Sequence, residues 1–315
     1  MKIVILDGYT TDERDLSWGE LEELGQLDYY ERTPADKVVE RAKDAEIILS
    51  NKVILSRDVL SQLGKLKYIG LLSTGFNVVD LEYAKQRGIP VCNIPNYSTK
   101  SVAQLTIALL LEIAMGAAKH SQSVRSGDWS ACKDFCYRVQ DITELDGKTI
   151  GLVGYGAIAK EVAKIATALG MIVIAYRRTP CQDGAMQMVG LDELYRRSDV
   201  ISMHCPMNSD SDKMIDSCAI SKMKDGVIIL NTARGGVVDE DAIRQGLDSG
   251  KIAGYGADVL SSEPPSKDNV LIGAPNCYIT PHIAWASREA RSRLMRIAID
   301  NVKGFLAGNV KNCVY

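Results

Sequence analysis

Short apolar runs alternate with amphipathic stretches along the chain. Over residues 1–99 the apolar runs are KIVILDG, AEIILSNKV, YIGLLSTG and IPVCNIP, and DLSWGELEELG between the first two has helical periodicity. A repeated strand–helix–strand order predicts a parallel sheet with helices on both faces. Residues 1–99 are therefore expected to form a doubly wound α/β domain.

A second series of the same kind follows residue 147. Its apolar runs are KTIGLVGYG, MIVIAYRR, DVISMHCP, GVIILNTARGG, IAGYGADVL and NCYITPHIA. They predict a second, larger doubly wound sheet. Between the two series lies VAQLTIALLLEIAMGAAKH, residues 102–120, which we interpret as a helix buried between the domains, because Gln, Thr and Glu interrupt it too often for a bilayer span.

The C-terminal stretch returns to helical periodicity. In REARSRLMRIAIDNVKGFLAGN the apolar residues Leu294, Ile297, Ala298 and Val302 fall near one face. No apolar run follows that could form a strand, so this helix is expected to pack on the first domain. The predicted domains are residues 1–99 plus 288–315, and residues 100–287.

Composition narrows the class of protein. The chain has 315 residues and a formal net charge of −3, with no long Lys/Arg block, which argues against nucleic acid or a membrane surface as a partner. The first residues lack the pattern of a signal peptide, so a cytoplasmic protein is expected. The eight cysteines are scattered, and Cys132 and Cys136 have no second pair or nearby histidine. Free thiols and no metal site are expected.

The strongest local motif is a glycine loop between a strand and a helix. Gly154 permits a tight turn, Gly156 lets the backbone approach a pyrophosphate, and Ala159 allows the helix to pack closely on the strand. The following helix N-terminus attracts the anion. Inside a complete strand–loop–helix–strand unit, this loop predicts dinucleotide binding; a glycine-rich turn without a ligand is the alternative.

The end of the next strand indicates which dinucleotide binds. About 20 residues after the glycine loop an acidic residue normally accepts from the ribose 2′-hydroxyl of NAD. Arg177 occupies that position here, followed by Arg178 and Thr179. These side chains would donate to a 2′-phosphate, which predicts a preference for NADPH. The alternative is that both arginines are solvated and NAD binds through other contacts.

Histidine is scarce, so candidates for proton transfer at neutral pH are few. His120 ends an apolar helix and is expected at the surface, and His204 adjoins a Cys-Pro turn, where a structural role is the simpler interpretation. His282 follows a strand end, where open parallel sheets place ligands. Arg234 and Glu263 follow the two preceding strand ends, so three ionisable groups lie at three successive strand ends.

These three groups suit the reduction of a 2-oxo acid. Arg234 has a planar fork of donors for a carboxylate or keto oxygen. His282, when protonated, can donate to the carbonyl oxygen as hydride arrives, and Glu263 can orient the imidazole. The alternative for Arg234 and Glu263 is a structural ion pair.

At these residues the sequence resembles the D-isomer-specific 2-hydroxyacid dehydrogenase family over essentially its whole length. The matching motifs are LLSTGFNVVDLEYAKQRGIPVCNIPNYSTKSVAQ, GYGAIA, NTARGGVVDE and ADVLSSEPP, besides Arg234, Glu263 and His282. The resemblance implies a flavodoxin-like substrate domain, a Rossmann cofactor domain, and an active site in the cleft between them. It also implies a homodimer, with GDWSACKDFCYRV at or near the interface.

The resemblance assigns further roles, all of which are expectations. The substrate would be bound by Ser73, by the backbone amides of Thr74 and Gly75, by Arg234 and His282, and by Trp285. Asp258 would contact the nicotinamide carboxamide. The cofactor would also be lined by Gly154, Tyr155, Gly156, Ala157, Ile158, Arg177, Arg178, Thr179, His204, Cys205, Pro206, Thr232, Ala233, Arg234, His282 and Ala284.

Within the family the chain is most similar to the glycerate dehydrogenases, also called hydroxypyruvate reductases. Glu263 distinguishes it from formate dehydrogenases, which carry an amide there. Ala159 in place of the third glycine is tolerated, and Trp285 stands where many members have a small residue and would narrow the pocket. Two alternatives stay open: a D-lactate or broader D-2-hydroxyacid dehydrogenase, and a corepressor-like protein that senses nicotinamide cofactor on the same fold.

Overall fold

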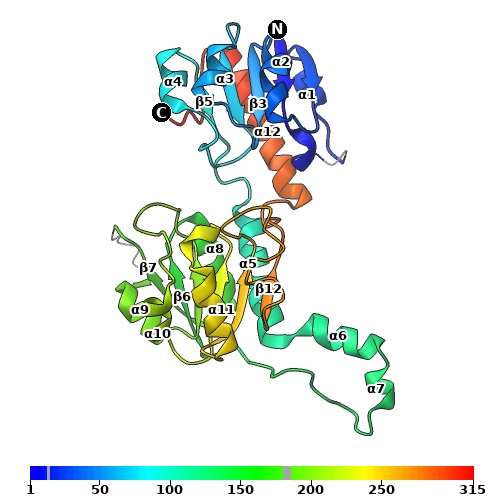
Figure 1. Ribbon diagram of the computed structural model, residues 1–315, viewed down its shortest axis with the longest axis vertical. Helices are drawn as coiled ribbons and strands as arrows, with labels where there is room; N and C mark the ends of the chain where they lie inside the picture. Colours follow the sequence, from blue (N-terminus) through cyan, green and yellow to red (C-terminus); the bar gives the residue numbers. More distant parts are fainter. Residues whose placement is uncertain (13–14, 180–185) are drawn as a thin grey trace. The chain divides into compact units, whose positions relative to one another are not determined.

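The computed structural model describes residues 1–12, 15–179 and 186–315, and the chain in it divides into two compact units (Figure 1). The first unit comprises residues 1–98 and 286–315, and the second comprises residues 99–285. Cys181, expected to be a free thiol, lies outside the described residues. Each unit is built on its own sheet.

The sheet of the first unit has five parallel strands in the order β2-β1-β3-β4-β5. This is the flavodoxin-like order, in which the chain direction across the sheet reverses between β1 and β3. Three of the four-residue strands are almost entirely buried, as expected for strands covered on both faces. The strands are β1 (Lys2–Ile5), β2 (Gln26–Tyr29), β3 (Ile47–Ser50), β4 (Tyr68–Leu71) and β5 (Val91–Cys92).

Helices cover both faces of this sheet. Residues of α2, α3 and α4 form one apolar cluster with Val4, Ile48 and Ile69, and the Phe305 ring of α12 lies 4.8 Å from the ring of Tyr68 in β4. The helices are α1 (Gly19–Glu22), α2 (Val38–Ala42), α3 (Arg57–Ser61), α4 (Leu81–Gln86) and α12 (Arg288–Leu306), with 3-10 turns η1 (Gly8–Thr10) and η2 (Ala35–Lys37).

The sheet of the second unit has seven parallel strands in the order β12-β11-β10-β9-β6-β7-β8. The direction reverses between β6 and β9, as in the Rossmann fold. The prediction of two doubly wound parallel sheets is therefore confirmed. The strands are β6 (Thr149–Val153), β7 (Ile172–Tyr176), β8 (Gln187–Met188), β9 (Val200–Met203), β10 (Val227–Asn231), β11 (Ile252–Ala257) and β12 (Cys277–Ile279).

Two apolar layers enclose this second sheet. One contains buried residues of α9, α10 and α11, and the other contains residues of α5 and α8. The helices are α5 (Thr99–Met115), α6 (Ala117–Arg125), α7 (Asp128–Ala131), α8 (Ala157–Ala168), α9 (Leu191–Arg197), α10 (Ser217–Ser221) and α11 (Glu240–Asp248), with the 3-10 turn η3 (Gly235–Val237).

Helix α5 differs from its prediction in length. It ends at Met115, because Gly116 adopts a positive φ of 58° and the chain bends before α6. It packs on the second unit's own sheet: a Cβ at Gly254 would lie 2.4 Å from the Ile113 side chain. The helix therefore belongs to the core of one unit. Among the described residues no single helix meets the criteria for a membrane span, although α5 and α6 meet them together, with a 58° bend.

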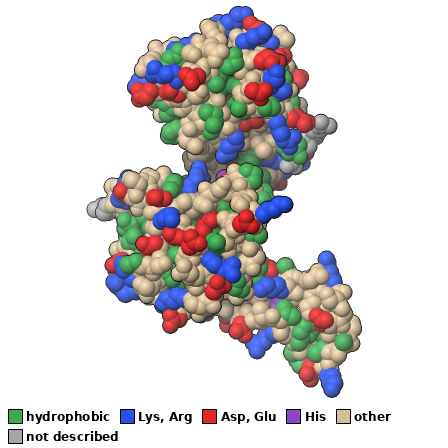
Figure 2. Space-filling model, viewed as in Figure 1, with side chains coloured by type: hydrophobic (Ala, Val, Ile, Leu, Met, Phe, Trp, Pro, Cys, Tyr) green, Lys and Arg blue, Asp and Glu red, His purple; other side chains and the backbone are tan. Residues whose placement is uncertain are grey.

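Helices α6 and α7 and the loop of residues 132–142 that follows them form an arm that extends away from the second sheet (Figures 1 and 2). Neither helix buries a side chain. The arm is held internally, since the Ser123 hydroxyl lies 2.9 Å from that of Tyr137 and the Trp129 indole donates to the carbonyl of Phe135 at 3.1 Å. Its apolar side chains are left exposed, Phe135 at 87% and Trp129 at 52%.

Candidate functional site

The three predicted catalytic residues follow neighbouring strands of one sheet. Arg234 comes three residues after β10, Glu263 six after β11 and His282 three after β12, and these strands are adjacent in the order β12-β11-β10. Because the strands are parallel, their carboxyl ends lie along one edge. The structure thus places all three residues in the second unit on the same edge.

His282 and Glu263 form a close pair. The imidazole Nδ1 lies 2.6 Å from Glu263 Oε2, and the other carboxylate oxygen accepts from the Leu260 N–H at 3.2 Å. About one third of each side chain is accessible. Within the described residues, His282 Nε2 has no hydrogen-bond partner. The pair therefore fixes one ring nitrogen and leaves the other available to a ligand.

A buried carboxylate shapes the turn that carries His282. Asp258, 1% exposed, accepts from Thr280 Oγ1 at 2.6 Å and from the N–H groups of Ile283 and Ala284 at 2.9 and 2.8 Å. Burial raises the pKa of Asp258, while these donors oppose the rise. His282 itself has a positive φ of 54°. Sequence reasoning missed this supporting role, because it assigned Asp258 only to the cofactor.

Arg234 is positioned by its backbone rather than by an ion pair. Its carbonyl accepts from Asn231 Nδ2 at 2.9 Å, and its guanidinium donates to the carbonyl of Ala233 at 2.7 Å. Within the described part of the chain the structure shows no ion pair between Arg234 and Glu263, so the alternative of a structural pair is not supported. Thr232, just before, is held through its hydroxyl, 2.8 Å from that of Thr106.

The glycine loop lies at the point where the second sheet reverses direction. Gly154 has φ of 92°, and a Cβ there would come within 2.8 Å of the backbone of His204 and Cys205 at the end of β9. Gly156, by contrast, has no atom within 4 Å of an added Cβ. This open space precedes the first turn of α8, and the N–H groups of a helix N-terminus favour binding of an anion. The loop fits a dinucleotide pyrophosphate.

Arg177 and Arg178, the two arginines after β7, are both exposed, and they differ in their contacts. Arg178 forms an ion pair with Asp210 at 2.5 Å. Arg177 has no hydrogen bond or ion pair to any described residue, and Thr179 is exposed. Pro180, which follows, is outside the described residues. Arg177 is thus the cation more readily available to a ligand.

His204 is not suited to proton transfer at neutral pH. Burial lowers its pKa to about 4, and its Nε2 lies 2.9 Å from the Ser202 hydroxyl. The next residue, Cys205, has a pKa raised by burial. The structure therefore favours the interpretation of His204 as a neutral, structural residue beside the glycine loop.

In the first unit, Ser73, Thr74 and Gly75 form a loop after β4. The Thr74 hydroxyl donates to the carbonyl of Ile94 at 2.8 Å, and Asn93 Nδ2 donates to the carbonyl of Thr74 at 2.7 Å. The N–H groups of Thr74 and Gly75 donate to no residue in the described ranges. Asn93 was missed from the sequence; its only signal is a polar residue directly after a buried strand.

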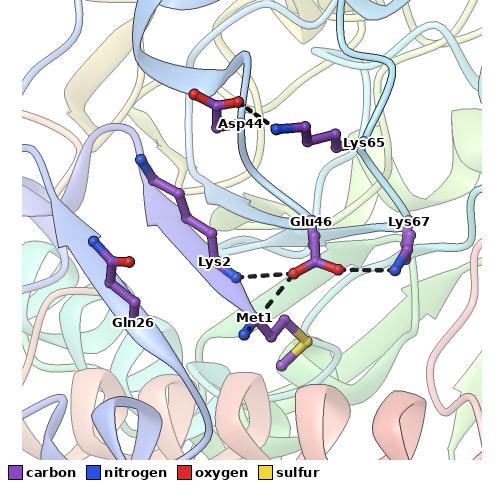
Figure 3. A pocket seen from close by; sticks show the side chains of 7 residues that line it. All are labelled: Met1, Lys2, Gln26, Asp44, Glu46, Lys65 and Lys67. Carbon is purple, nitrogen blue, oxygen red and sulfur yellow. Dashed lines mark hydrogen bonds and ion pairs between the residues drawn. The ribbon is translucent and has the colours of Figure 1, made fainter.

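The first unit also has two surface hollows. One, of about 470 Å³, lies at the amino ends of the strands, and its charges pair with one another: Lys65 with Asp44 at 2.7 Å and Lys67 with Glu46 at 2.8 Å (Figure 3). The other, of about 580 Å³, lies beside the carboxyl ends of β1, β2 and β3, the edge where open α/β sheets bind ligands. Paired charges at the wrong edge make the first hollow a poor candidate.

Comparison with known proteins agrees with this geometry. Residues 107–284 match the model of the D-isomer specific 2-hydroxyacid dehydrogenase, NAD binding domain. The chain is 46% identical to hydroxypyruvate reductase of Blautia hydrogenotrophica, covering 100% of this chain and 99% of the relative. It is 42% identical to glycerate dehydrogenase of Methylorubrum extorquens, over 99% and 98% of the two chains.

A solved structure shares the fold over its full length. The acyclic imino acid reductase Bsp5, in complex with NADPH and D-Arg, superposes with a TM-score of 0.89 at 30% identity and full coverage of both chains. Two parallel-sheet units, a glycine loop at a strand-order reversal and the match to an NAD binding domain together identify the class as the nicotinamide-dinucleotide-dependent oxidoreductases. Within that class, this chain belongs to the D-isomer-specific 2-hydroxyacid dehydrogenase family.

Proposed function

We propose that this enzyme reduces hydroxypyruvate to the D-2-hydroxy acid D-glycerate, and the smaller glyoxylate to glycolate. The observation that carries the proposal is the His282–Glu263 pair, 2.6 Å apart and with His282 Nε2 open, on the sheet edge that also carries Arg234. The names of the two relatives, hydroxypyruvate reductase and glycerate dehydrogenase, favour this substrate over lactate or a sensing role.

Each residue of the proposed site has a different role in the reduction. His282 donates a proton from Nε2 to the carbonyl oxygen of the oxo acid, and Glu263 stabilises the protonated imidazole through Nδ1. Arg234 donates to the same oxygen or to the carboxylate, which stabilises the developing alkoxide. A bound nicotinamide cofactor supplies the hydride. We also propose that the N–H groups of Thr74 and Gly75, which donate to no described residue, bind the substrate carboxylate, and that Trp285 limits the size of the substrate side chain.

Activity with a set of oxo acids tests this proposal. Hydroxypyruvate, glyoxylate, pyruvate and phenylpyruvate are each assayed with NADH and NADPH, and hydroxypyruvate is expected to give the highest kcat/KM. His282→Ala is expected to lose turnover while its cofactor Kd stays within about twofold of wild type. Cofactor oxidation with none of the four acids, or an equal loss of cofactor binding in His282→Ala, would contradict the proposal.

Glu263→Gln tests the pair itself. Gln keeps an acceptor for Nδ1 but not the charge, and charges about 4 Å apart interact by roughly 1 kcal/mol in water and 4 kcal/mol near a protein surface. Since a third of each side chain is accessible, kcat/KM is expected to fall about 10- to 100-fold. Asp225→Asn, which removes a carboxylate paired with Lys251 but 92% exposed, is the control and should change it less than about twofold.

NADPH is proposed as the preferred cofactor, because Arg177 replaces the acidic residue and offers a donor to a 2′-phosphate. The NADPH complex of the imino acid reductase is consistent with this, whereas the NAD named for the family's domain keeps NAD as the alternative. Arg177→Asp is expected to shift the ratio of kcat/KM for NADPH over NADH at least tenfold toward NADH. A wild-type preference for NADH would refute the assignment.

A homodimer formed through the α6–α7 arm is also proposed. The arm exposes Phe135, Trp129, Val124 and Ile142 without covering them by its own fold, and an apolar surface of this kind indicates an interface. Wild type should elute at twice the chain mass in light-scattering chromatography, and Phe135→Ser should shift toward monomer. Phe76→Ser, which changes an exposed phenylalanine of the first unit, should not.

We also propose that the protein acts in the cytoplasm, because the described cysteines are free thiols.

A further inference from the structure

Two cysteines far apart in sequence face each other in the first unit. Cys92, in β5, and Cys313, near the C-terminus, form an isolated antiparallel bridge. The Asn93 N–H donates to the carbonyl of Asn312 at 3.1 Å on one side, and the Val314 N–H donates to that of Val91 at 3.0 Å on the other. The hydrogen bonds join the residues next to the cysteines and not the cysteines themselves. Cys92 and Cys313 therefore form a non-hydrogen-bonded pair of an antiparallel ladder, whose Cα atoms are typically about 4.5 Å apart.

This separation is within the range a disulfide can span, roughly 4.4–6.8 Å between Cα atoms. Side chains of such a pair lie on the same face of the two strands, so the sulfur atoms point to the same side. Both residues are free thiols in the structure. The antiparallel pairing of the two residues is therefore compatible with a disulfide between them.

The two thiols differ in reactivity. Cys92 is fully buried, and burial raises the pKa of its thiol to about 11, with a contribution from the neighbouring Cys313. Cys313 is exposed, and its Sγ donates to the carbonyl of Tyr315 at 3.3 Å. Because oxidants react with accessible thiols first, Cys313 is the entry point and Cys92 the resolving partner.

We propose that Cys92 and Cys313 form a site of reversible oxidation by hydroperoxides, whose product is a disulfide that ties the C-terminal segment to β5. The peroxide transfers one oxygen to Cys313, giving sulfenic acid and water or an alcohol. The Cys92 sulfur then attacks the Cys313 sulfur; the S–S bond forms, the S–O bond breaks and water leaves. Two thiols lose two electrons and two protons in total, and the peroxide gains them.

The disulfide would act next to a chain of amide hydrogen bonds. Asn312 Nδ2 donates to Asn301 Oδ1 at 2.8 Å, Asn301 Nδ2 donates to the carbonyl of Asn93 at 3.1 Å, and Asn93 Nδ2 donates to the carbonyl of Thr74. The two residues beside the cysteines, Asn93 and Asn312, are thus both in this network. Oxidation would therefore restrict motion between the C-terminal segment and the Thr74 loop. An effect of this restriction on substrate binding rests on the proposed function, whereas the disulfide itself does not.

Peptide mapping of the intact protein tests the site. Wild type is treated with a few equivalents of hydrogen peroxide and digested without reductant. We expect a peptide pair joining Cys92 to Cys313, about 2 Da lighter than the two thiol peptides together and separated by dithiothreitol. Cys313→Ser should lack it, whereas Cys218→Ser, which removes another exposed cysteine, should retain it. Oxidation of Cys313 to sulfinic acid with Cys92 left as a free thiol would overturn the proposal.

Thermal unfolding gives a second readout. A disulfide between residues 92 and 313 closes a long loop in the unfolded chain and so favours the folded state. Peroxide should raise the Tm of wild type and of Cys218→Ser by several degrees, and dithiothreitol should reverse the rise. In Cys313→Ser peroxide should not raise it. An unchanged or lowered Tm in cross-linked wild type would show that the bond strains the bridge.

Discussion

The two glycines of the cofactor loop give a matched pair of substitutions with opposite expected effects. At Gly156 φ is −96° and an added Cβ meets no atom within 4 Å, so Ala fits the protein itself. The same methyl group would occupy the space into which a pyrophosphate must come. Gly156→Ala is therefore expected to leave folding intact and to weaken cofactor binding.

At Gly154 the constraint is internal. A φ of 92° costs a residue with a Cβ roughly 1–2 kcal/mol, and contact at 2.8 Å with the backbone of Cys205 adds a similar amount. A total of about 2–4 kcal/mol corresponds to a Tm decrease of roughly 5–15 °C for a unit of this size. At Gly156, by contrast, Ala should change the free energy of unfolding by less than about 1 kcal/mol.

Both variants are measured by thermal unfolding without cofactor and by fluorescence titration with NADPH. A methyl group that crowds the bound ligand costs about 1–3 kcal/mol, which predicts a Kd about 5- to 150-fold weaker for Gly156→Ala at unchanged Tm. Gly154→Ala should lower the Tm first. Wild-type affinity in Gly156→Ala would refute the reasoning, because it would mean that the pyrophosphate does not approach this residue.

Three further predictions concern buried or supporting groups. Burial lowers the pKa of His204 to about 4, below its ordinary value of about 6.5, so the unfolded chain binds this proton first as the pH falls. The contribution to stability is therefore retained above pH 6.5 and is lost between pH 6.5 and 4, by at most ~3 kcal/mol. Urea unfolding at several pH values should show that the free energy of unfolding depends less on pH in His204→Gln than in wild type. Asp258→Asn should lower the free energy of unfolding by about 1–3 kcal/mol, because Asn has one acceptor oxygen where the carboxylate has two, and should reduce turnover by displacing His282; an unchanged melting curve would contradict this. Asn93→Ala should raise the KM for the oxo acid more than it lowers kcat, because it frees the Thr74 loop; steady-state kinetics with cofactor Kd as the control measures the split.

The class of fold could be predicted from the sequence because it depends on a repeated local pattern. Apolar runs separated by helical stretches permit few arrangements other than parallel sheets. The break in α5 could not be predicted, because it depends on one torsion: Gly116 interrupts an apolar pattern that otherwise continues, and only its positive φ shows that the helix ends there. A single glycine in a helical pattern is usually tolerated.

Some residues of the candidate site could likewise be predicted from the sequence and others could not. His282 could be selected as the candidate proton donor because histidine is scarce in the chain and proton transfer near neutral pH favours this side chain. Asp258 and Asn93 act by bonding to backbone groups, and a residue with that role follows no periodic pattern. The adjacency of β10, β11 and β12, which brings Arg234 to the same edge as His282, becomes evident only once strand order is known.

The two arginines after β7 are not equivalent in the structure. The sequence presents them as equivalent donors to a 2′-phosphate. In the fold Arg178 is already paired with Asp210 at 2.5 Å, so binding a phosphate would require it to share or break that contact. Arg177 has no such competition among the described residues. Arg177→Ala should therefore weaken NADPH binding more than Arg178→Ala does, and the reverse order in a titration would show that the ion pair with Asp210 positions Arg178 for the phosphate instead.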